Sequence, residues 1–321
     1  MKPKSRGRSG PVDVVTGGAG FIGSHVAEAL LGLGRGVRVI DDLSAGDRAN
    51  VPEGAEFLEG DLLDLAPLAL GGADVVYHLA AVPSVPHSIE RPLESHRSNV
   101  EATLAVLAEA ERAGVRRVVF ASSSAVYGDA PGLPRRERQD PAPRSPYAVG
   151  KLCGEHYARY WAGTGRLETV SLRFFNVYGP RQDPRSPYAA VIPLFLERLH
   201  AGEPLVVFGD GHQTRDFTCV SDVARGMTTA GLISRLPGPC YNVASGRPVS
   251  VLELAETLAR RIGRPLNVRH APPRPGDVSH SWADTSAARR ELGFEAKVPL
   301  EDGLGWTVEW FRRRSGVAAG R

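Results

Sequence analysis

The stretch TGGAGFIGSH, residues 16–25, decides the fold. It follows a β-branched run and opens a helical pattern, and its glycines Gly17, Gly20 and Gly23 recur at every third position. The first glycine permits a tight turn, the second lets the backbone approach a pyrophosphate, and the third allows close packing of helix on strand. The free N–H groups at the helix N-terminus then face the phosphates. The spacing therefore predicts a dinucleotide site, the alternative being an ordinary turn between strand and helix.

Acidic residues after the second and third strands sharpen this prediction. Asp41 and Asp42 end the second strand, 18 residues beyond the last glycine, where a carboxylate can accept hydrogen bonds from an adenosine ribose. The same carboxylate would repel a 2′-phosphate, and no arginine follows it directly, the next one along the chain being Arg48. NAD is therefore favoured over NADP. The motif EGDLLD places Asp61 and Leu62 where they can flank the adenine, although Gly-Asp is also common in turns.

Short apolar strands alternate with helical segments of 10–18 residues from residue 12 to residue 179. Continuous apolar strands separated by helices indicate a parallel sheet that is covered on both faces. The pattern then changes, since residues 180–214 and 247–315 hold short mixed elements. We therefore expect an α/β fold, a Rossmann-like doubly wound parallel sheet with helices on both faces, plus a smaller mixed α/β nucleotide-sugar-binding domain. The NAD-binding domain is expected over 12–179 together with about 215–246.

The composition is that of a globular protein. Hydrophobic residues make up 42% of the 321 residues, charged residues make up 23%, and the formal net charge is +3. Four basic side chains fall within residues 1–11, so the rest of the chain is close to neutral. This argues against nucleic-acid binding, which calls for a basic face on the folded body. Residues 1–11 are expected to form a disordered basic leader.

The cysteines and the hydropathy of the sequence indicate whether a metal site, an oxidising compartment or a membrane span is expected. Cys153, Cys219 and Cys240 are odd in number and lack the paired spacing of a zinc site or a disulfide framework, so no metal is expected. Reduced cysteines fit a cytoplasmic protein. The sequence shows neither a signal-peptide core nor a run of about 18 apolar residues, so no membrane partner is expected.

A second motif, SPYAVGK at residues 145–151, holds Tyr147 four residues before Lys151. On a helix the two side chains share one face, and the lysine charge favours the phenolate, which lowers the pKa of the phenol. Ser122, Ser123 and Ser124 end a strand, and Ser123 lies 24 residues before the tyrosine. A serine hydroxyl there could hold a substrate alcohol for proton removal paired with hydride transfer. A bare Tyr-x-x-x-Lys pair is usually a surface accident, but the glycine turn and the serine-tipped strand favour the catalytic interpretation.

Six motifs occur in a recognisable order: TGGAGFIGSH, DDLS, HLAA, SSSAVYG, YAVGK and RFFNVYGPRQDP. Together they resemble the extended short-chain dehydrogenase/reductase superfamily and its NAD-dependent epimerase/dehydratase family, within which the chain is similar to nucleotide-sugar 4-epimerases. The resemblance runs from about residue 12 to residue 315. It implies that NAD stays bound while carbon-4 of a UDP-sugar is oxidised to a ketone, the sugar turns over, and hydride returns to its other face. It also implies a homodimer built on the helices at 94–113 and 147–162.

The resemblance assigns roles to the second motif and to the walls of the cofactor site. Tyr147 would exchange the 4-hydroxyl proton, Lys151 would hold the nicotinamide ribose and lower the tyrosine pKa, and Ser123, with Ser124 close by, would bond the 4-oxygen. The residues implied to bind NAD are Gly17, Gly20, Phe21, Ile22, Gly23, Asp41, Asp42, Ser44, Asp61, Leu62, Leu79, Ala80, Ala81, Asn99, Ser122, Tyr147, Lys151 and Phe174.

The nucleotide end resembles the family's UDP clamp. Arg215 and Arg274 would neutralise the diphosphate, since each guanidinium offers a fork of donors, although either alone would ordinarily be a solvated surface residue. Asn176 would meet a phosphate, and Asp277 would hold the uridine ribose. The residues implied to bind substrate are Ser84, Ser123, Asn176, Arg185, Ala190, Val191, Val207, Phe208, Arg215, Arg274, Asp277 and Ser281.

Departures from related enzymes narrow the reaction. Related 4,6-dehydratases carry an acid pair directly after the catalytic Ser/Thr, and glucuronate decarboxylases carry a glutamate at the second of these positions. Here the two positions are Ser124 and Ala125, which cannot transfer those protons. A net redox enzyme that exchanges its cofactor and a non-catalytic NAD-binding regulator stay as alternatives. Loss of the tyrosine or the lysine would mark the regulator, and both are present.

The sugar is left open among three classes. Ser281 falls where the family's pocket-gating residue lies, and a small side chain leaves room for an N-acetyl group or for a shifted sugar. Arg181 and Arg185 lie in the loop expected to cover the sugar, where either could pair with a carboxylate at carbon-6 or merely brace the loop. UDP-glucuronate is the first choice, with UDP-glucose/UDP-galactose and the UDP-N-acetylhexosamines as alternatives.

Overall fold

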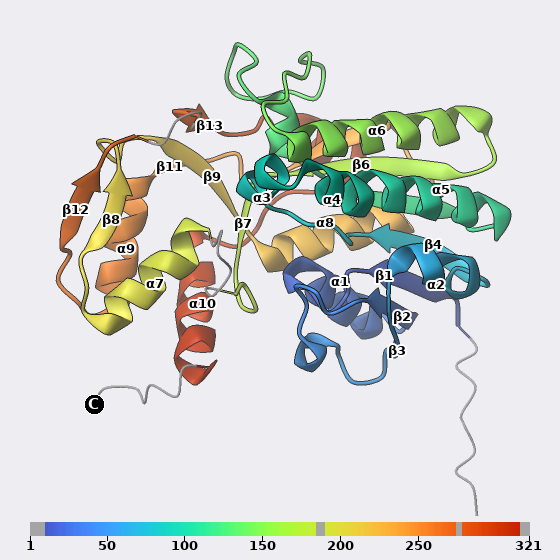
Figure 1. Ribbon diagram of the computed structural model, residues 1–321, viewed down its shortest axis with the longest axis horizontal. Helices are drawn as coiled ribbons and strands as arrows, with labels where there is room; N and C mark the ends of the chain where they lie inside the picture. Colours follow the sequence, from blue (N-terminus) through green and yellow to red (C-terminus); the bar gives the residue numbers. More distant parts are fainter. Residues whose placement is uncertain (1–9, 184–189, 274–277, 315–321) are drawn as a thin grey trace, which may run out of the picture.

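Seven parallel strands form the larger sheet, in the order β10-β6-β5-β4-β1-β2-β3 (Figure 1). The computed structural model describes residues 10–183, 190–273 and 278–314. The strand order reverses between β1 and β4, which is where an open α/β sheet binds its ligand. The strands are β1 (Val12–Thr16), β2 (Gly36–Asp41), β3 (Glu56–Glu59), β4 (Ala73–His78), β5 (Arg117–Ser123), β6 (Glu168–Phe174) and β10 (Cys240–Val243).

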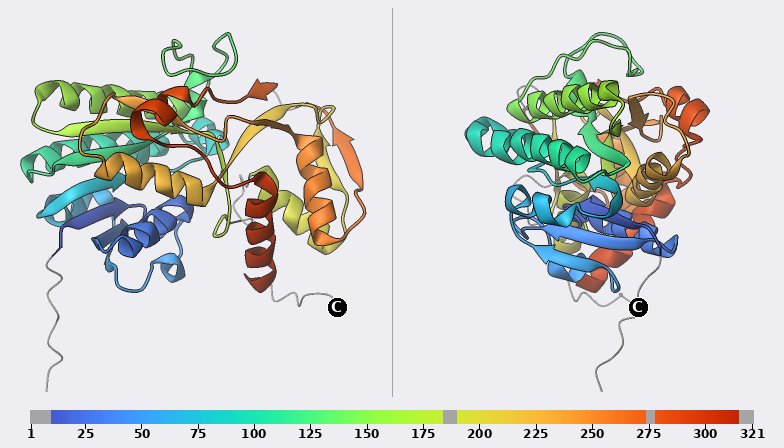
Figure 2. Two further views of the ribbon diagram at one scale, coloured as in Figure 1. Left: turned by 180° about the vertical axis from the view of Figure 1, so that it is seen from behind. Right: turned by 90° about the vertical axis from the view of Figure 1, so that its right-hand side faces the viewer.

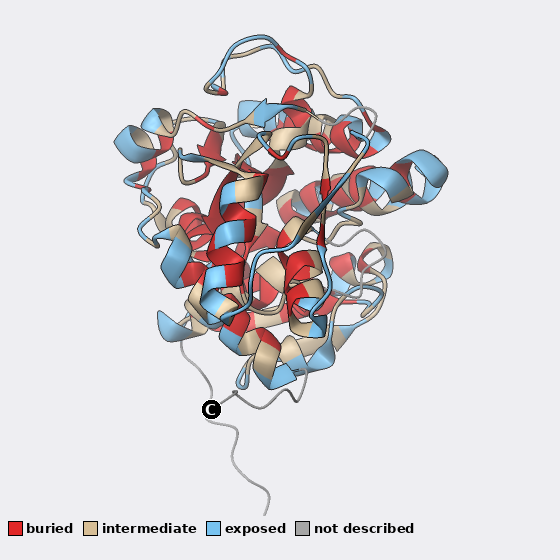
Figure 3. Cartoon of the chain, turned by 90° about the vertical axis from the view of Figure 1, so that its left-hand side faces the viewer, coloured by how far each residue is buried: buried red, intermediate tan, exposed pale blue. Residues whose placement is uncertain are grey.

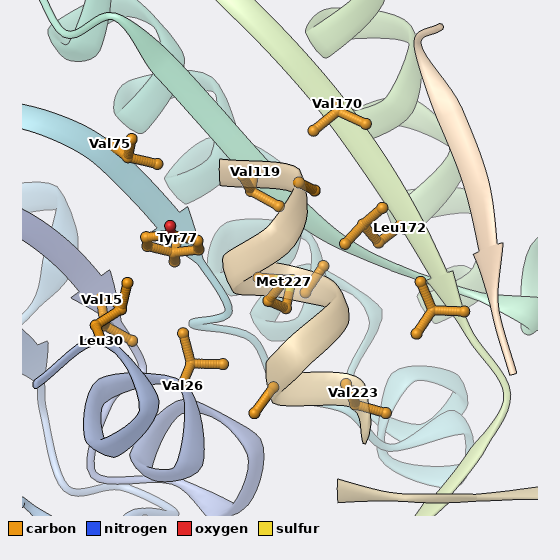
Figure 4. Packing of buried hydrophobic residues seen from close by; sticks show 14 of the residues in the cluster. Val15, Val26, Leu30, Val75, Tyr77, Val119, Val170, Leu172, Val223 and Met227 are labelled. Atoms are coloured by element: carbon orange, nitrogen blue, oxygen red, sulfur yellow. The ribbon is translucent and has the colours of Figure 1, made fainter. Parts of the chain in front are cut away.

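Both faces of this sheet are buried. Successive residues of a strand point to opposite faces, so Val14 joins one hydrophobic cluster and Val15 the other. Figure 4 shows the second cluster, in which Val15 and Val119 of the sheet meet Met227 from a covering helix. This burial explains why the strands read as continuous apolar runs.

Helices cover the two faces in two groups (Figure 2). The cluster on one face draws on α1 (Phe21–Gly32) and α8 (Val220–Leu232). The cluster on the other face draws on α2 (Leu62–Ala69), α5 (Ala102–Arg112) and α6 (Pro146–Thr164). The expected fold class, a Rossmann-like sheet with helices on both faces, is thereby confirmed. Shorter helical segments are η1 (Arg48–Asn50), α3 (Val85–Glu90), α4 (Pro92–His96), η2 (Arg97–Glu101) and η3 (Ser124–Tyr127).

A smaller part lies beside the carboxyl ends of these strands, on the left of Figure 1. It has its own hydrophobic cluster, built from three helices and two small sheets. The helices are α7 (Val191–Ala201), α9 (Val251–Ile262) and α10 (Leu300–Arg314). The short segment η4 (Ala288–Leu292), which lies between α9 and α10 in the chain, packs instead in the cluster of the larger sheet. The strands are β7 (Asn176–Tyr178), β8 (Leu205–Phe208), β9 (Thr214–Cys219), β11 (Pro248–Ser250), β12 (Val268–Ala271) and β13 (His280–Ser281).

The chain rejoins the larger sheet later than its sequence pattern indicates. We expected the return at about residue 215, but β9 pairs with β7, β11 and β13 in the smaller part. Phe217 and Cys219 of β9 are buried in the cluster of that part. The return therefore begins with α8, and β10 completes it by pairing with β6. Figure 3 shows the resulting burial, with buried residues inside the layers and exposed ones on the outer helix faces.

Candidate functional site

A cavity of about 330 Å³ opens at the carboxyl ends of the strands, where the strand order reverses. It extends from the glycine turn after β1 to the first turns of α6. Almost all residues implied to bind NAD line it, namely Gly17, Gly20, Phe21, Ile22, Gly23, Asp41, Asp42, Ser44, Asp61, Leu62, Leu79, Ala80, Ala81, Ser122, Tyr147, Lys151 and Phe174.

The glycine turn has no room for side chains. Gly17 has a φ of 69°, and a Cβ there would lie 2.8 Å from the backbone nitrogen of Ala80. A Cβ on Gly23 would lie 2.1 Å from the carbonyl oxygen of Gly17, so the start of α1 packs directly on the turn. The N-terminus of α1 therefore faces the cavity with its backbone exposed, which suits a phosphate group.

Asp41 is held rigidly at the end of β2. Its Oδ2 accepts a hydrogen bond from the N–H of Ala19 at 3.0 Å, and its Oδ1 accepts one from the N–H of Leu43 at 2.9 Å. Burial raises the pKa of this carboxyl, and the two N–H donors oppose that rise. A carboxylate offers about four acceptor positions, so the group keeps capacity for a hydroxyl donor such as a ribose.

The surroundings of Asp42 bear on the choice between NAD and NADP. Its Oδ1 accepts hydrogen bonds from both the N–H and the hydroxyl of Ser44. The nearby Arg48 stacks its guanidinium on the ring of Phe57, 3.8 Å from the centroid. That contact occupies the first arginine that follows the acids in the sequence, so they keep the negative character that disfavours a 2′-phosphate.

Arg97 is a cavity residue that the sequence did not reveal. Its Nη2 lies 2.9 Å from Oδ2 of Asp61, and both line the cavity. Asp61 also caps α2 by accepting from the N–H of Leu63, and these two donors lower the pKa of its carboxyl. The other unpredicted lining residues are mostly small or apolar and carry no sequence signal: Ile40, Ala45, Gly46, Gly60, Leu63, Val82, Pro83, Ser98, Ala102 and Ala121.

Asn99 supports the cavity wall. It is buried, its Oδ1 accepts from the N–H of Val82 at 2.8 Å, and its Nδ2 donates to the oxygens of Val82 and Ser95. The structure thus places Asn99 as a brace for Val82, which itself lines the cavity.

Tyr147 and Lys151 meet the end of β5 at one end of the cavity. Ser145 caps α6, so Tyr147 stands in the first turn of the helix. The Tyr147 hydroxyl faces the Ser123 side chain, and this contact favours the phenolate by lowering the pKa of the phenol. Lys151 Nζ donates to the carbonyl oxygen of Ala121 at 2.8 Å and lies 5.9 Å from the centroid of the Tyr147 ring. A phenol bonded to a serine hydroxyl beside an ammonium group can exchange a proton with an alcohol.

The pKa of Tyr147 corrects one expectation. We expected the charge of Lys151 to lower it, but burial raises the pKa of this phenol, and the hydrogen bond with Ser123 opposes that rise only in part. Burial also lowers the pKa of Lys151 to about 8. Burial disfavours the charged form of both groups, and the ammonium is bonded to a backbone carbonyl.

The three serines at the end of β5 have different roles. Ser122 donates its hydroxyl to Oε1 of Glu155 at 2.5 Å, so its hydroxyl is directed at α6. Ser123 accepts from the N–H of Ala125 and is bonded to the tyrosine. Ser124 begins η3 and is half-buried. The Ser123 hydroxyl is therefore the one that reaches the phenol.

The small sheet brings several implied substrate residues together. β13 pairs with β9 so that Ser281 is the register partner of Arg215. β7 also pairs with β9, which places Asn176 opposite Phe217. This strand begins two residues after Phe174, which lines the cofactor cavity. Arg215 Nη1 donates to the carbonyl oxygen of Thr214. This sheet therefore continues from the cofactor cavity into the smaller part.

Other implied substrate residues are more scattered. Ala190 and Val191 form the start of α7, and Phe208 ends β8. The side chain of Val207 is buried in the cluster of the smaller part, so it packs in the core and does not face a ligand. Ser84 caps α3, accepting at its hydroxyl oxygen from the N–H of His87. Arg185, Arg274 and Asp277 lie outside the described residues.

Arg181 is paired within the protein. Its Nη2 lies 2.8 Å from Oε2 of Glu28 on α1. The ring of His25, also on α1, is hydrogen-bonded to the carbonyl oxygen of Pro180 at 3.0 Å. The loop after β7 is thus fastened to the helix that begins at the glycine turn.

The described part of the chain offers neither a metal-binding cluster nor a membrane-spanning helix. Across residues 10–183, 190–273 and 278–314, no cluster of His, Cys, Asp and Glu could hold a metal ion. Within the same ranges, none of the helices combines the length and apolar character needed to span a bilayer.

The chain resembles known proteins over almost its whole length. The sequence model of the NAD-dependent epimerase/dehydratase family matches residues 14–244. A UDP-glucose 4-epimerase of Mycolicibacterium smegmatis is 39% identical over 316 residues, which cover 94% of this chain and 99% of that protein.

Solved structures agree with the sequence comparison. A UDP-N-acetylglucosamine 4-epimerase from Methanobrevibacter ruminantium, in complex with UDP-N-acetylmuramic acid, superposes with a TM-score of 0.91 at 37% identity, covering 95% of this chain and 99% of that one. A UDP-glucuronic acid 4-epimerase from Bacillus cereus, in complex with UDP-glucuronic acid and NAD, gives a TM-score of 0.87 at 32% identity, covering 94% and 99%.

Proposed function

The chain belongs to the NAD-dependent epimerase/dehydratase family, and on this premise we propose that it is an isomerase that inverts carbon-4 of a UDP-hexose with NAD held in the cavity. The observation that carries the proposal is the gathering of Tyr147, Ser123 and Lys151 at the end of the cavity that begins at the glycine turn. Relatives named as UDP-sugar 4-epimerases support the same reaction.

The residues present fit NAD. The cradle at the glycine turn would be filled by any Cβ on Gly17 or Gly23, which leaves exposed backbone for a pyrophosphate. Asp41 offers acceptors to an adenosine ribose, and Asp61 with Leu62 flanks the adenine end. NAD supplies the acceptor and donor of hydride when it is bound.

The chain's own residues would handle the proton and the oxygen. Tyr147 takes the 4-hydroxyl proton and returns it, because it lies in the cavity with its hydroxyl bonded to Ser123. Ser123 holds the 4-oxygen, and Lys151 supplies positive charge and a donor at the ribose of the cofactor. Ala125 stands where a proton-transferring acid would be needed for dehydration, which supports inversion without loss of water.

UDP-glucuronate is the sugar that we propose first, with UDP-galacturonate as its product. The support is an arginine-bearing cover loop and a structurally similar relative crystallised with UDP-glucuronic acid. Because Arg181 is paired with Glu28, the carboxylate-binding role falls to Arg185. UDP-glucose/UDP-galactose and the UDP-N-acetylhexosamines stay as alternatives, the latter supported by the small side chain of Ser281 in the sheet beside Arg215.

The test is incubation of the purified protein with each of the three UDP-sugars, without added cofactor, followed by separation of the products. We expect interconversion of UDP-glucuronate and UDP-galacturonate without net NADH. Conversion of another UDP-sugar alone would overturn the choice of sugar. NADH produced in step with the product would instead favour a net dehydrogenase.

We also propose that the chain forms a homodimer through the helices around α5 and α6. Large apolar side chains stand exposed on these neighbouring helices, including Leu93 at 83%, Tyr160 at 64%, Ile89 at 61% and Val149 at 53%. Apolar surface of this kind is often covered in an assembly. A molar mass near 34.4 kDa from light scattering would contradict the dimer.

A further inference from the structure

A buried ion pair lies directly behind the serine-tipped end of β5. Glu155 of α6 and Arg173 of β6 form a bidentate contact, with Nη2 to Oε2 at 2.7 Å and Nε to Oε1 at 2.9 Å. Their side chains are 4% and 3% exposed. Ser122 of β5 donates its hydroxyl to Oε1 of the same glutamate. Three elements therefore meet at one carboxylate.

Ser122 lies in the chain between two residues that contact the proposed catalytic side chains. Its preceding neighbour Ala121 accepts the hydrogen bond from Lys151, and its following neighbour Ser123 faces Tyr147 and lowers the pKa of the phenol. Glu155 stands one turn after Lys151 on the same helix. The bond from Ser122 to Glu155 thus joins strand and helix between the two contacts on which the proposed chemistry depends.

We propose that Glu155, held by Arg173 and bonded to Ser122, is a positioning residue that fixes the end of β5 against α6 and so sets the alignment of Ser123 with Tyr147. This inference rests on the proposed epimerase function. It also gives Ser122 a part beyond the one expected: the residue lines the cavity, and its hydroxyl acts through Glu155.

The surroundings of the ion pair make it a rigid support. The Arg173 guanidinium lies 4.7 Å from the ring centroid of Tyr127, whose hydroxyl donates to Asn242 at 2.6 Å. A buried, fully bonded charge pair tolerates little movement, because separating its members leaves an uncompensated charge in the interior. The thiol of Cys240 lies nearby, and burial raises its pKa to about 12, so it adds no charge at neutral pH.

The test compares Ser122→Ala with Ser122→Thr. The alanine variant removes the hydroxyl and leaves the Glu155–Arg173 pair intact, whereas threonine keeps a hydroxyl. We expect Ser122→Ala to lower kcat by roughly 10- to 100-fold with KM little changed, as small misalignments of reacting groups do, and Ser122→Thr to recover most of that loss. Ser122→Cys, with the same shape and a weak donor, gives the same comparison if the alanine variant does not fold.

A pH profile separates positioning from a loss of stability. Two groups face Tyr147: the ammonium group of Lys151 from α6 and the hydroxyl of Ser123 from β5. The contact with Ser123 lowers the pKa of the phenol. If this contact loosens in Ser122→Ala, the pKa of the phenol should rise. The fall of kcat on the acidic side of the pH profile should then begin at higher pH. A change in stability alone would leave the start of that fall in place.

Thr169→Val is the matched control. Thr169 of β6 donates its buried hydroxyl to the carbonyl oxygen of Ala158 on α6, and neither residue lines the cavity. It should show a similar loss of thermal stability with wild-type kcat and pH profile. The inference is overturned if Ser122→Ala keeps kcat within about twofold of wild type, if threonine fails to recover activity, or if the variant loses NAD while the NAD-loaded fraction turns over normally.

Failure of the proposed function looks different. In that case the wild-type protein itself would not epimerise any of the three UDP-sugars, and no variant would be informative about turnover. An active wild type with an unaffected Ser122→Ala would reject the positioning role alone.

Discussion

The guanidinium of Arg181 lies 2.8 Å from the carboxylate of Glu28, so the loop after β7 is tied to the helix that starts at the glycine turn. The bond between His25 and the carbonyl oxygen of Pro180 reinforces the same attachment. Glu28 is 57% exposed, so the ion pair contributes little to stability. The ion pair matters instead for recognition of the substrate, because a guanidinium already paired with a carboxylate is a poor candidate for binding a sugar carboxylate.

Arg181→Ala should therefore not change the choice of sugar. We expect kcat/KM for UDP-glucuronate and for UDP-glucose to fall by the same factor, less than about fivefold, because the lost contact is a partly exposed ion pair. Arg185→Ala is the comparison, and it should lower kcat/KM for UDP-glucuronate selectively by roughly 10- to 100-fold, as loss of a hydrogen bond to a charged group does. Steady-state kinetics with both sugars measures this, and a selective effect of Arg181→Ala would reverse the assignment.

Tyr147→Phe should abolish turnover while leaving UDP-sugar and NAD binding nearly unchanged. The lost hydroxyl is the one bonded to Ser123, and general acid–base groups of this kind contribute about 10²–10⁴-fold to the rate. Tyr178→Phe is the matched control, because that buried hydroxyl donates to the carbonyl oxygen of Leu300 at 3.2 Å in the smaller part. It should cost about 1 kcal/mol of stability and no turnover. Wild-type activity in Tyr147→Phe would reject the mechanism.

The larger sheet and the helices on its two faces could be predicted from local patterns alone. The turn around Gly17 needs a left-handed backbone, and the alternation of apolar strands with helices follows from the burial of both sheet faces. The placement of β9 could not be predicted, since a short strand whose last four residues are all buried fits either sheet. Its assignment depends on contacts with β7, β11 and β13, which come from distant parts of the sequence.

Several contacts within the site could not be predicted from the sequence, for the same reason. Arg97 bonds Asp61 across 36 residues, and Arg181 bonds Glu28 across 153, so no spacing rule links either pair. The pKa of Tyr147 depends on burial, which a sequence motif does not report. Motifs therefore indicated which residues meet, while the structure shows what surrounds them.

Gly23→Ala should abolish NAD retention. Its Cβ would lie 2.1 Å from the carbonyl oxygen of Gly17, so the turn or the start of α1 must move away from the cofactor. Gly32→Ala, at the other end of the same helix, meets nothing within 4 Å and should stabilise the protein by about 0.4–1 kcal/mol. The NAD content per chain, measured after denaturation, checks both variants. Full retention in Gly23→Ala would show that the turn adapts without harm to the site.

Lys151→Met should stabilise the protein at neutral pH while it destroys activity. Burial lowers the pKa of Lys151 from 10.5 to about 8, so holding the proton costs folding free energy. The unfolded chain binds the extra proton between these two values, and the stability contributed by this group therefore rises as pH increases from about 8 to about 10.5. Below pH 8 the cost is fully present, and removal of the charge should gain on the order of 1–3 kcal/mol, less the cost of leaving the Ala121 carbonyl unbonded.

Thermal unfolding of the wild type and the variant across pH 7–10.5 separates these contributions, because other titrating groups are common to both proteins. The variant's advantage in stability should be largest near pH 7 and should shrink steadily above pH 8, as the wild-type lysine loses its proton in the folded state. A difference that stays constant over this range would mean that Lys151 titrates normally. The lysine would then incur no cost from burial, and the stabilisation would have to come from the packing of methionine alone.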